Sequence, residues 1–202
     1  MRVKRRLALW KLWHDLRRAP KRNIILGAGS TRYPGWTATN IRALDITNEQ
    51  HWRRSFQPGS IDLLLMSHVL EHIAPAEGPT ALRLCYQYLK PRGCLRIAVP
   101  DGYRRDAAYL AEVSPPRDGH QALYTIDSLS ALLSEAGFEL DPLEYFDKEG
   151  KFHFKEWDQA RGHVARSRRY DKQTSFPYED MFYTSVIIDA VKPGGKPEGP
   201  RG

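Results

Sequence analysis

The hydrophobic residues of the chain fall into short continuous runs, separated by stretches in which apolar positions recur with helical spacing. Residues 61–66 (IDLLLM) are the clearest run. This run is too continuous for a half-exposed strand and too short for a buried helix, which predicts a strand covered on both faces. Comparable runs predict further strands at residues 23–26, 36–41, 94–99, 138–146 and 183–191, with a short extended piece at 43–46.

Helical spacing between these runs predicts helices at residues 48–54, 78–89, 103–112 and 125–136. Alternation of strands and helices is typical of an α/β fold, here a mostly parallel sheet with helices on both faces. The first crossover departs from this pattern, because only STRYPG separates Gly29 from Trp36. A parallel crossover normally needs about a dozen residues, so we expect this one to be shortened to a loop.

Charge separates the first 22 residues from the rest. They carry nine Lys or Arg against Asp15, a net charge of +8, so the total of +7 leaves −1 for the remaining residues. Leu9, Leu12, Trp13 and Leu16 form one stripe, which predicts a basic amphipathic helix over residues 1–22. Two interpretations remain open. The helix contacts an anionic membrane surface or nucleic-acid phosphates, or it packs its stripe on the domain and leaves its cations in water.

Composition sets the remaining boundaries. Residues 23–192 form one predicted domain, and the Pro/Gly-rich residues 193–202 are predicted to be a disordered tail. Cys85 and Cys94 lack the spacing and the histidine neighbours of a zinc site. They suit a reducing compartment, and we expect no bound metal. No apolar run approaches the roughly 20 residues of a membrane-spanning helix, so we expect a cytoplasmic protein.

Polar side chains gather immediately after the strand predicted at 61–66. Ser67, His68, Glu71 and His72 stand at its carboxyl end, where open α/β sheets bind their ligands. His68 is a candidate base or acceptor-orienting group, because histidine titrates near neutral pH. His72 is either catalytic or a structural histidine that fixes the turn by hydrogen bonds.

Two further places are candidates for substrate contacts. Asp101 follows the strand predicted at 94–99 and either orients the substrate or shapes a Pro-Asp-Gly turn. Residues 151–180 are rich in His, Arg and aromatic residues and precede the last strand, so we expect an insertion that covers the substrate crevice. Its His153, Arg166 and Arg168 are candidate acceptor contacts or part of a solvated loop.

Taken together, several motifs resemble those of the class I methyltransferases that use S-adenosylmethionine. They are GAG at 27–29, LDI at 44–46, SHVLEHI at 67–73, LKPRGCLRIAVPD at 89–101, LSEAGFEL at 133–140 and YTSVIIDAV at 183–191. The resemblance covers about residues 22–192 and is closest to a small bacterial group, type 11-like, that carries the SHVLEHI motif. It implies a Rossmann-like class I methyltransferase fold, a seven-stranded sheet whose last strand runs antiparallel.

The same resemblance implies which residues bind the cofactor. Gly27, Ala28 and Gly29 match the loop that cradles its methionine end, and Asn40 stands where an acidic residue usually binds the ribose hydroxyls. The pair beside the adenine corresponds to Asp45 and Ile46, and the residues facing the sulfonium correspond to Ser67 and His68.

The implied activity is transfer of a methyl group from S-adenosylmethionine to an O or N atom of an acceptor, either a glycan or another small metabolite. The alternative is a non-catalytic, methyltransferase-like module that docks on a membrane or on nucleic acid through residues 1–22. A dinucleotide-dependent dehydrogenase fits poorly, because Arg32 stands where the third glycine of GxGxxG is required.

Overall fold

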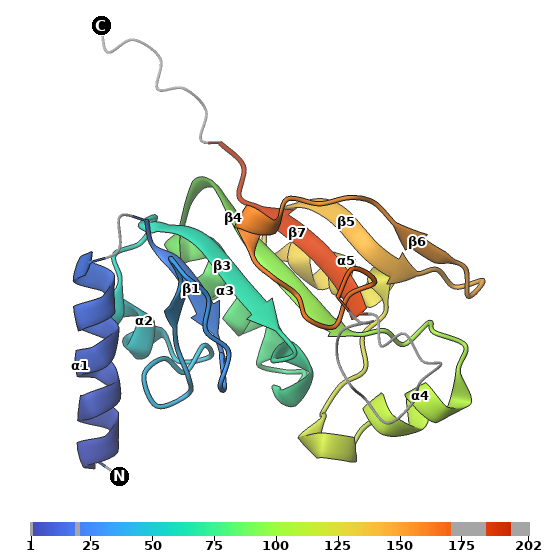
Figure 1. The fold of residues 1–202 in the computed structure, drawn as a ribbon, viewed down its shortest axis with the longest axis horizontal. Helices are drawn as coiled ribbons and strands as arrows, with labels where there is room; N and C mark the ends of the chain where they lie inside the picture. The colour runs from blue at the N-terminus through green and yellow to red at the C-terminus, as the bar shows by residue number, and fades with distance from the viewer. Residues whose placement is uncertain (1, 19–20, 171–184, 195–202) are drawn as a thin grey trace, which may run out of the picture.

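The computed structural model describes residues 2–18, 21–170 and 185–194. In chain order its elements are α1 (Arg2–Arg18), β1 (Asn23–Leu26), β2 (Thr37–Ala38), α2 (Glu49–Ser55), β3 (Ile61–Ser67), η1 (Leu70–His72), α3 (Gly78–Tyr88), β4 (Leu89–Pro100), α4 (Ala107–Val113), η2 (Arg117–Gly119), α5 (Ile126–Glu135), β5 (Glu139–Phe146), β6 (Phe152–Phe154), η3 (Gln159–Arg161) and β7 (Ser185–Val191) (Figure 1). The tail predicted at 193–202 and the end of the predicted insertion, 171–180, lie largely outside the described residues.

A seven-stranded sheet with the order β2-β1-β3-β4-β7-β5-β6 forms the centre of the described chain (Figure 1). β1 pairs in parallel with β2 and β3, and β3 pairs in parallel with β4. β7 runs antiparallel to both of its neighbours, β4 and β5, and β6 runs antiparallel to β5. The predicted Rossmann-like sheet with an antiparallel last strand is therefore confirmed, and β6 adds a short antiparallel edge.

The first crossover is a loop, as predicted, because residues 27–36 connect β1 to β2 through turns alone. The strand predicted at 36–41 is shorter, and the extended piece predicted at 43–46 is wrong, since the chain turns there. Asn40 Oδ1 accepts from the N–H groups of Arg42 (3.0 Å) and Ala43 (3.3 Å), and such local bonds compete with strand pairing. The strand predicted at 61–66 is consequently the third strand in the chain, β3.

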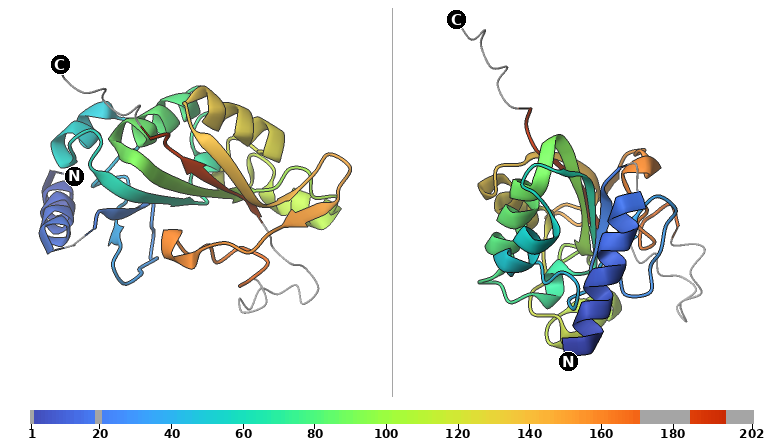
Figure 2. Two further views of the ribbon diagram at one scale, coloured as in Figure 1. Left: turned by 90° about the horizontal axis from the view of Figure 1, so that it is seen from above. Right: turned by 90° about the vertical axis from the view of Figure 1, so that its left-hand side faces the viewer.

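The two faces of the sheet are covered differently. Helices α2, α3 and α5 lie on one face, above a core that contains Trp52, Leu82 and Leu129 (Figure 2). Residues 155–170 run along the opposite face, where Trp157 and Val164 pack on buried side chains of β1, β3 and β7 (Figure 2). We expected helices on both faces. With the first crossover reduced to a loop, this irregular segment, called the covering segment below, takes their place.

A buried ion pair fastens the covering segment to the sheet. Arg96 of β4 donates to both carboxylate oxygens of Asp189 of β7, at 2.7 and 2.8 Å, and both residues are almost completely buried. Its Nη1 donates to the carbonyls of Asp158 and Gly162, at 2.7 Å each. The guanidinium also lies over the Trp157 ring, 4.5 Å from its centroid. One side chain thus joins two strands and the segment.

Helix α1 lies beside β2 at the edge of the sheet (Figure 1). Leu12 is buried in the core and Leu16 is half-buried, which agrees with part of the predicted stripe. Trp13, expected in the stripe, is 46% exposed, and Leu7 and Trp10 are 62% and 65% exposed. The helix therefore buries one narrow face and leaves a second apolar row, made of Leu7, Trp10 and Trp13, exposed. Among the described helices, none is long and apolar enough to cross a membrane.

Local capping explains where the helices begin. Asn48 caps α2 through a bond from the N–H of Gln50, and Thr125 forms a capping box with Ser128 at the start of α5. The helix predicted at 103–112 begins later, because Asp106 caps α4 by accepting from Tyr109 N. Six residues, 101–106, therefore lie between the end of β4 and the start of α4.

Candidate active site

A cavity of about 350 Å³ opens beyond the carboxyl ends of β1 and β3. This volume lies within the roughly 300–1,000 Å³ of small-molecule sites. Four residues predicted from the sequence meet there, namely Gly27, Asp45, Ile46 and His72. The lining also includes Ile41, Leu44, Thr47, Val69, Ile73, Ala74, Glu77 and Gln121. The walls are therefore mainly aliphatic, with the carboxylates of Asp45 and Glu77, the imidazole of His72 and the amide of Gln121.

Gly27 is required at the end of β1 for two reasons. Its φ of +59° is left-handed, and a Cβ there would lie 2.6 Å from Cγ2 of Val69. Glycine therefore lets the β1 loop approach the β3 loop across the cavity. Gly29 also has a positive φ of +52°, but a Cβ on it would meet nothing within 4 Å. Ala28, which is buried, and Gly29 do not line the cavity.

The turn that holds Asp45 is rigid. Asp45 Oδ1 accepts from the N–H and the hydroxyl of Thr47, at 3.1 and 2.9 Å, and Asp45 N–H donates to His51 Nδ1 at 3.1 Å. Ile46 is fixed next to it, because Trp52 Nε1 donates to its carbonyl at 3.0 Å. Asn40, the predicted ribose contact, is exposed and uses its Oδ1 in the turn described above, outside the cavity lining.

The backbone bends at His68, directly after β3. His68 has a φ of +55°, unusual for a residue with a side chain. Because of this bend Val69 and His72 line the cavity, whereas Ser67 and His68 do not. The 3₁₀ helix η1 begins two residues after His68, at Leu70.

The His68 ring lies between β7 and the covering segment. The Ser185 hydroxyl donates to the carbonyl of Arg166 at 2.8 Å, so it accepts from His68 Nε2 at 3.0 Å. Nδ1 then carries the lone pair and faces Arg166 Nη1 at 3.2 Å and Glu71 Oε1 at 3.1 Å. Burial lowers the pKa of His68 and Arg166 lowers it further, against an opposing effect of Glu71. The imidazole is therefore neutral at neutral pH.

Asp101, a predicted substrate contact, is fully buried and bound to the protein itself. Its Oδ1 accepts from Tyr103 N–H at 2.9 Å and its Oδ2 from Phe146 N–H at 2.7 Å. Burial raises the pKa of its carboxyl to about 6, although both N–H groups act in the opposite direction. The carboxylate connects the loop after β4 to the end of β5.

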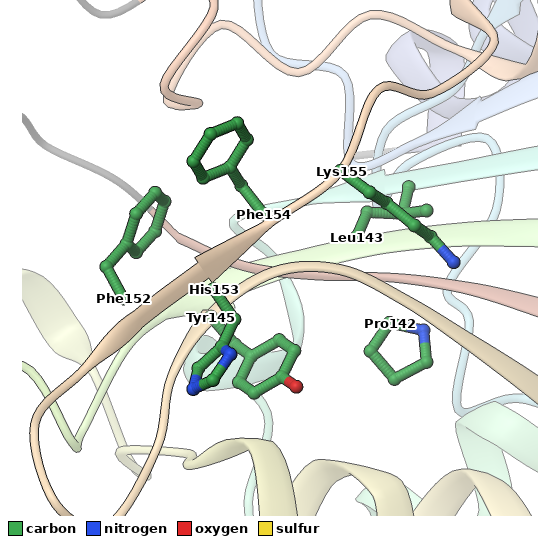
Figure 3. Close-up of a pocket in the computed structure, with 7 residues that line it drawn as sticks. All are labelled: Pro142, Leu143, Tyr145, Phe152, His153, Phe154 and Lys155. Carbon is green, nitrogen blue, oxygen red and sulfur yellow. The ribbon is translucent and has the colours of Figure 1, made fainter.

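His153 and Arg168, two predicted acceptor contacts, lie toward the opposite edge of the sheet. His153 of β6 stacks on Tyr145 and pairs with Asp147 (Nε2 to Oδ2, 2.6 Å) beside a hollow of about 340 Å³ (Figure 3). Phe152 and Phe154 point away from His153 (Figure 3). Arg168 lies over the Phe154 ring, 3.7 Å from its centroid. Of the three predicted contacts in the insertion, only Arg166 reaches His68.

Several residues of the site and its surroundings were not expected from the sequence. Val69, Ile73 and Gln121 of the cavity carry no local signal of binding. Arg96 and Asp189 did carry one, because each interrupts an apolar strand with a charge. The strand register places these two residues opposite each other, and paired burial follows from it.

Comparisons with known proteins identify the family and the fold. A family model described as a methyltransferase domain matches residues 13–143, more than half of the chain. A sequence search of curated proteins finds no significant match.

Solved structures share the fold at low identity. The chain is similar to an S-adenosylmethionine-dependent methyltransferase from Archaeoglobus fulgidus, with 16% identity, 93% of this chain and 94% of that chain covered, and a TM-score of 0.50. It is similar to a possible histamine N-methyltransferase from Thermotoga maritima, with 16% identity, coverage of 93% and 91%, and a TM-score of 0.50. A Burkholderia thailandensis 1,6-didemethyltoxoflavin-N1-methyltransferase, solved with its substrate and S-adenosylhomocysteine, gives 17% identity, coverage of 94% and 78%, and a TM-score of 0.50.

The cavity lies at the strand ends where open α/β sheets bind ligands, and the fold is that of the enzymes named above. Since the family model spans most of the sheet, the chain belongs to the methyltransferase domain family, and its fold is that of the Rossmann-like enzymes that use S-adenosylmethionine.

Proposed function

We propose that this protein transfers a methyl group from S-adenosylmethionine to an O or N atom of a small acceptor, a glycan or another metabolite. The observation that carries the proposal is the cavity at the ends of β1 and β3, in which Gly27, Asp45 and Ile46 meet. Family membership supports the reaction class.

The residues of the cavity fit the adenosyl part of the cofactor. Aliphatic walls from Leu44, Ile46 and Ile73 suit a flat apolar base, and Asp45 offers a carboxylate oxygen beyond the one bonded to Thr47. Gly27 leaves room for a ligand to approach the main chain, since a side chain there would collide with Val69. When bound, S-adenosylmethionine supplies an electrophilic methyl group on a sulfonium.

Residues of the chain would then have to hold the acceptor and remove its proton. His68 suits this role because it is neutral and its Nδ1 lone pair is available as a base once Arg166 shifts toward the acceptor. A proton on Nδ1 would face the buried Glu71 carboxylate at 3.1 Å, which stabilises the imidazolium. Arg166 favours an acceptor that carries negative charge.

The covering segment belongs to this proposal as the part that selects the acceptor. It brings Arg166 to His68 and is fixed by the buried Arg96 pair. His72 lines the cavity beside Val69, on the cofactor side of the bend at His68. Donor and acceptor would thus approach the end of β3 from its two sides.

Calorimetry with S-adenosylhomocysteine tests the cofactor site. We expect saturable binding to the wild-type chain and roughly tenfold weaker binding to Asp45→Asn, because an amide keeps the bond to Thr47 but loses the charge-assisted bond, a difference of about 1.4 kcal/mol. Asp141→Asn is the matched control, since Asp141 is an exposed carboxylate of β5 paired with Lys155. No binding at millimolar ligand, or equal losses in both variants, would contradict the proposal.

The exposed row on α1 supports a second activity, docking on an anionic lipid surface. Leu7, Trp10 and Trp13 are exposed on a helix within a segment of net charge +8, and tryptophan combined with basic residues favours the membrane interface. We expect the chain to sediment with vesicles of phosphatidylserine and phosphatidylcholine but not with phosphatidylcholine alone. Trp10→Ser should reduce binding and Phe154→Ser, at a 50% exposed phenylalanine of β6, should not. Equal sedimentation with both kinds of vesicle would reject docking.

A further inference from the structure

One cluster at the rim of the cavity combines three metal-ligand side chains from two separate segments. Glu71 and His72 belong to η1, and His120 follows η2, 48 residues after His72 in the chain. A carboxylate oxygen and two ring nitrogens of these residues lie within 4.8 Å of one another. We expected no bound metal because of the spacing of the two cysteines, but this cluster contains no cysteine and therefore falls outside that prediction.

The main chain holds the two segments together. The N–H of Gln121 donates to the carbonyl of Glu71 at 2.7 Å, and its side-chain amide donates to the carbonyl of His72 at 2.7 Å. Ala122 N–H also donates to the Glu71 carbonyl at 3.3 Å. The relative position of the three side chains is therefore fixed by backbone contacts, as a preorganised site requires.

Glu71 is the unusual member of the cluster. It is completely buried, and neither carboxylate oxygen accepts a well-formed hydrogen bond from the described residues. The nearest ring nitrogen, His68 Nδ1, lies 3.1 Å from Oε1, but its lone pair faces Arg166. A buried carboxylate without donors is strongly unfavourable, so a bound cation would stabilise this side chain.

His120 has the orientation of a metal ligand. Its Nδ1–H donates to the carbonyl of Val113 at 2.7 Å, which leaves the lone pair on Nε2. Histidines that bind metals usually donate their other ring N–H to a carbonyl or carboxylate, which fixes the tautomer. The ring of the exposed His72 meets the His120 ring edge to face, with centroids 4.8 Å apart.

We propose that Glu71, His72 and His120 bind one divalent transition-metal ion of the zinc type. Two imidazoles and one carboxylate suit zinc, whereas calcium and magnesium prefer all-oxygen sites. Ligand atoms at about 2.1 Å from one zinc ion are at most about 4.2 Å apart, so the three side chains, whose ligand atoms lie within 4.8 Å of one another, must move slightly closer together. The fourth position is left for water or a substrate atom. The ion would fasten η1 to the loop after η2, at the rim of the cavity.

Titration of the full, metal-free chain with zinc chloride tests the site without any methyl donor, so its outcome is independent of the proposed reaction. We expect one zinc ion per chain and a rise in the melting temperature. Cobalt(II) should give the strong visible absorption of a four-coordinate ion. His72→Ala, at an exposed position, should weaken zinc binding by on the order of tenfold or more, because even outer-shell changes cost about 10–100-fold. His14→Ala, at an exposed histidine of α1, should bind as the wild type does.

Glu71→Gln provides the second measurement, because it keeps the shape of the side chain and removes the charge. We expect it to remain folded by circular dichroism and to lose the melting shift with zinc. The proposal would be overturned if the wild type bound no zinc, if His72→Ala and Glu71→Gln both bound it as tightly as the wild type, or if the cobalt spectrum were that of a six-coordinate aqueous ion.

Discussion

The ion pair between Arg96 and Asp189 gives the sharpest prediction of stability. Arg96→Met keeps most of the side-chain stem but removes both bonds to Asp189 and both bonds to the covering segment. Asp189 is 2% exposed, so its charge would stay buried with only the longer contact from Arg161 Nη1, 3.4 Å from its Oδ2. Breaking a buried pair in this way costs about 3–5 kcal/mol, a large share of the roughly 5–15 kcal/mol that stabilises a typical domain.

Urea unfolding followed by tryptophan fluorescence measures this loss as a shift of the midpoint at unchanged slope. Lys90→Met is the matched control on the same strand, because Lys90 pairs with Asp62 at 2.6 Å but is exposed, and exposed pairs contribute about 0–1 kcal/mol. The double variant Arg96→Met with Asp189→Leu should be more stable than Arg96→Met alone, since the buried charge of Asp189 is then removed as well. If Arg96→Met cost no more than Lys90→Met, the ion pair would not hold the covering segment as we argue.

Three further predictions concern the cavity and its surroundings. Gly27→Ala should weaken S-adenosylhomocysteine binding and destabilise the chain by more than the roughly 1–2 kcal/mol expected from its positive φ. Gly29→Ala is the control, because Gly29 has a similar φ but open space around it, and it should show only the conformational cost. Equal effects of the two substitutions would refute the predicted collision with Val69. His68→Gly should keep the bend and the affinity for S-adenosylhomocysteine but slow turnover by about 10²–10⁴-fold; unchanged turnover would remove His68 as the base. The pKa of Asp101, about 6 against an ordinary 3.8, means that the folded state holds the proton more tightly, so its contribution to stability is complete below pH 3.8 and is lost as pH rises through 6. Wild type should therefore lose unfolding free energy between pH 4.5 and 7.5 relative to Asp101→Asn, and parallel pH profiles would contradict the assignment.

Much of the fold follows from local pattern. The continuous run at 61–66 became β3, and the caps at Asn48 and Thr125 set the starts of α2 and α5. Within the site, glycine after β1 was recognisable because the backbone turns sharply there, whereas Asp45 was expected only from the resemblance to class I methyltransferases. Apart from Asp45, such features depend on interactions between residues that are close in the sequence, so a local sequence pattern can predict them.

The missed features depend on contacts between distant residues. Nothing near residues 155–170 indicates that they replace a helix on the sheet face, since that depends on the shortened crossover more than 100 residues earlier. The strand expected at 43–46 failed because the Asn40 side chain satisfies the backbone locally. His68 was expected beside the sulfonium, but one residue with a positive φ turned it toward Arg166 and turned Val69 into the cavity.

The position of β7 has a consequence for the order of folding during synthesis. This strand follows β5 and β6 in the sequence, yet it lies between β4 and β5, so a nascent polypeptide synthesised only as far as residue 182 has two half-sheets with unpaired edges. Until Asp189 has been synthesised, Arg96 has no counter-charge, and the ion pair that fastens the covering segment to the sheet cannot form. Completion of the fold should therefore be a late, concerted event, in which insertion of one strand joins the halves and closes the second core together.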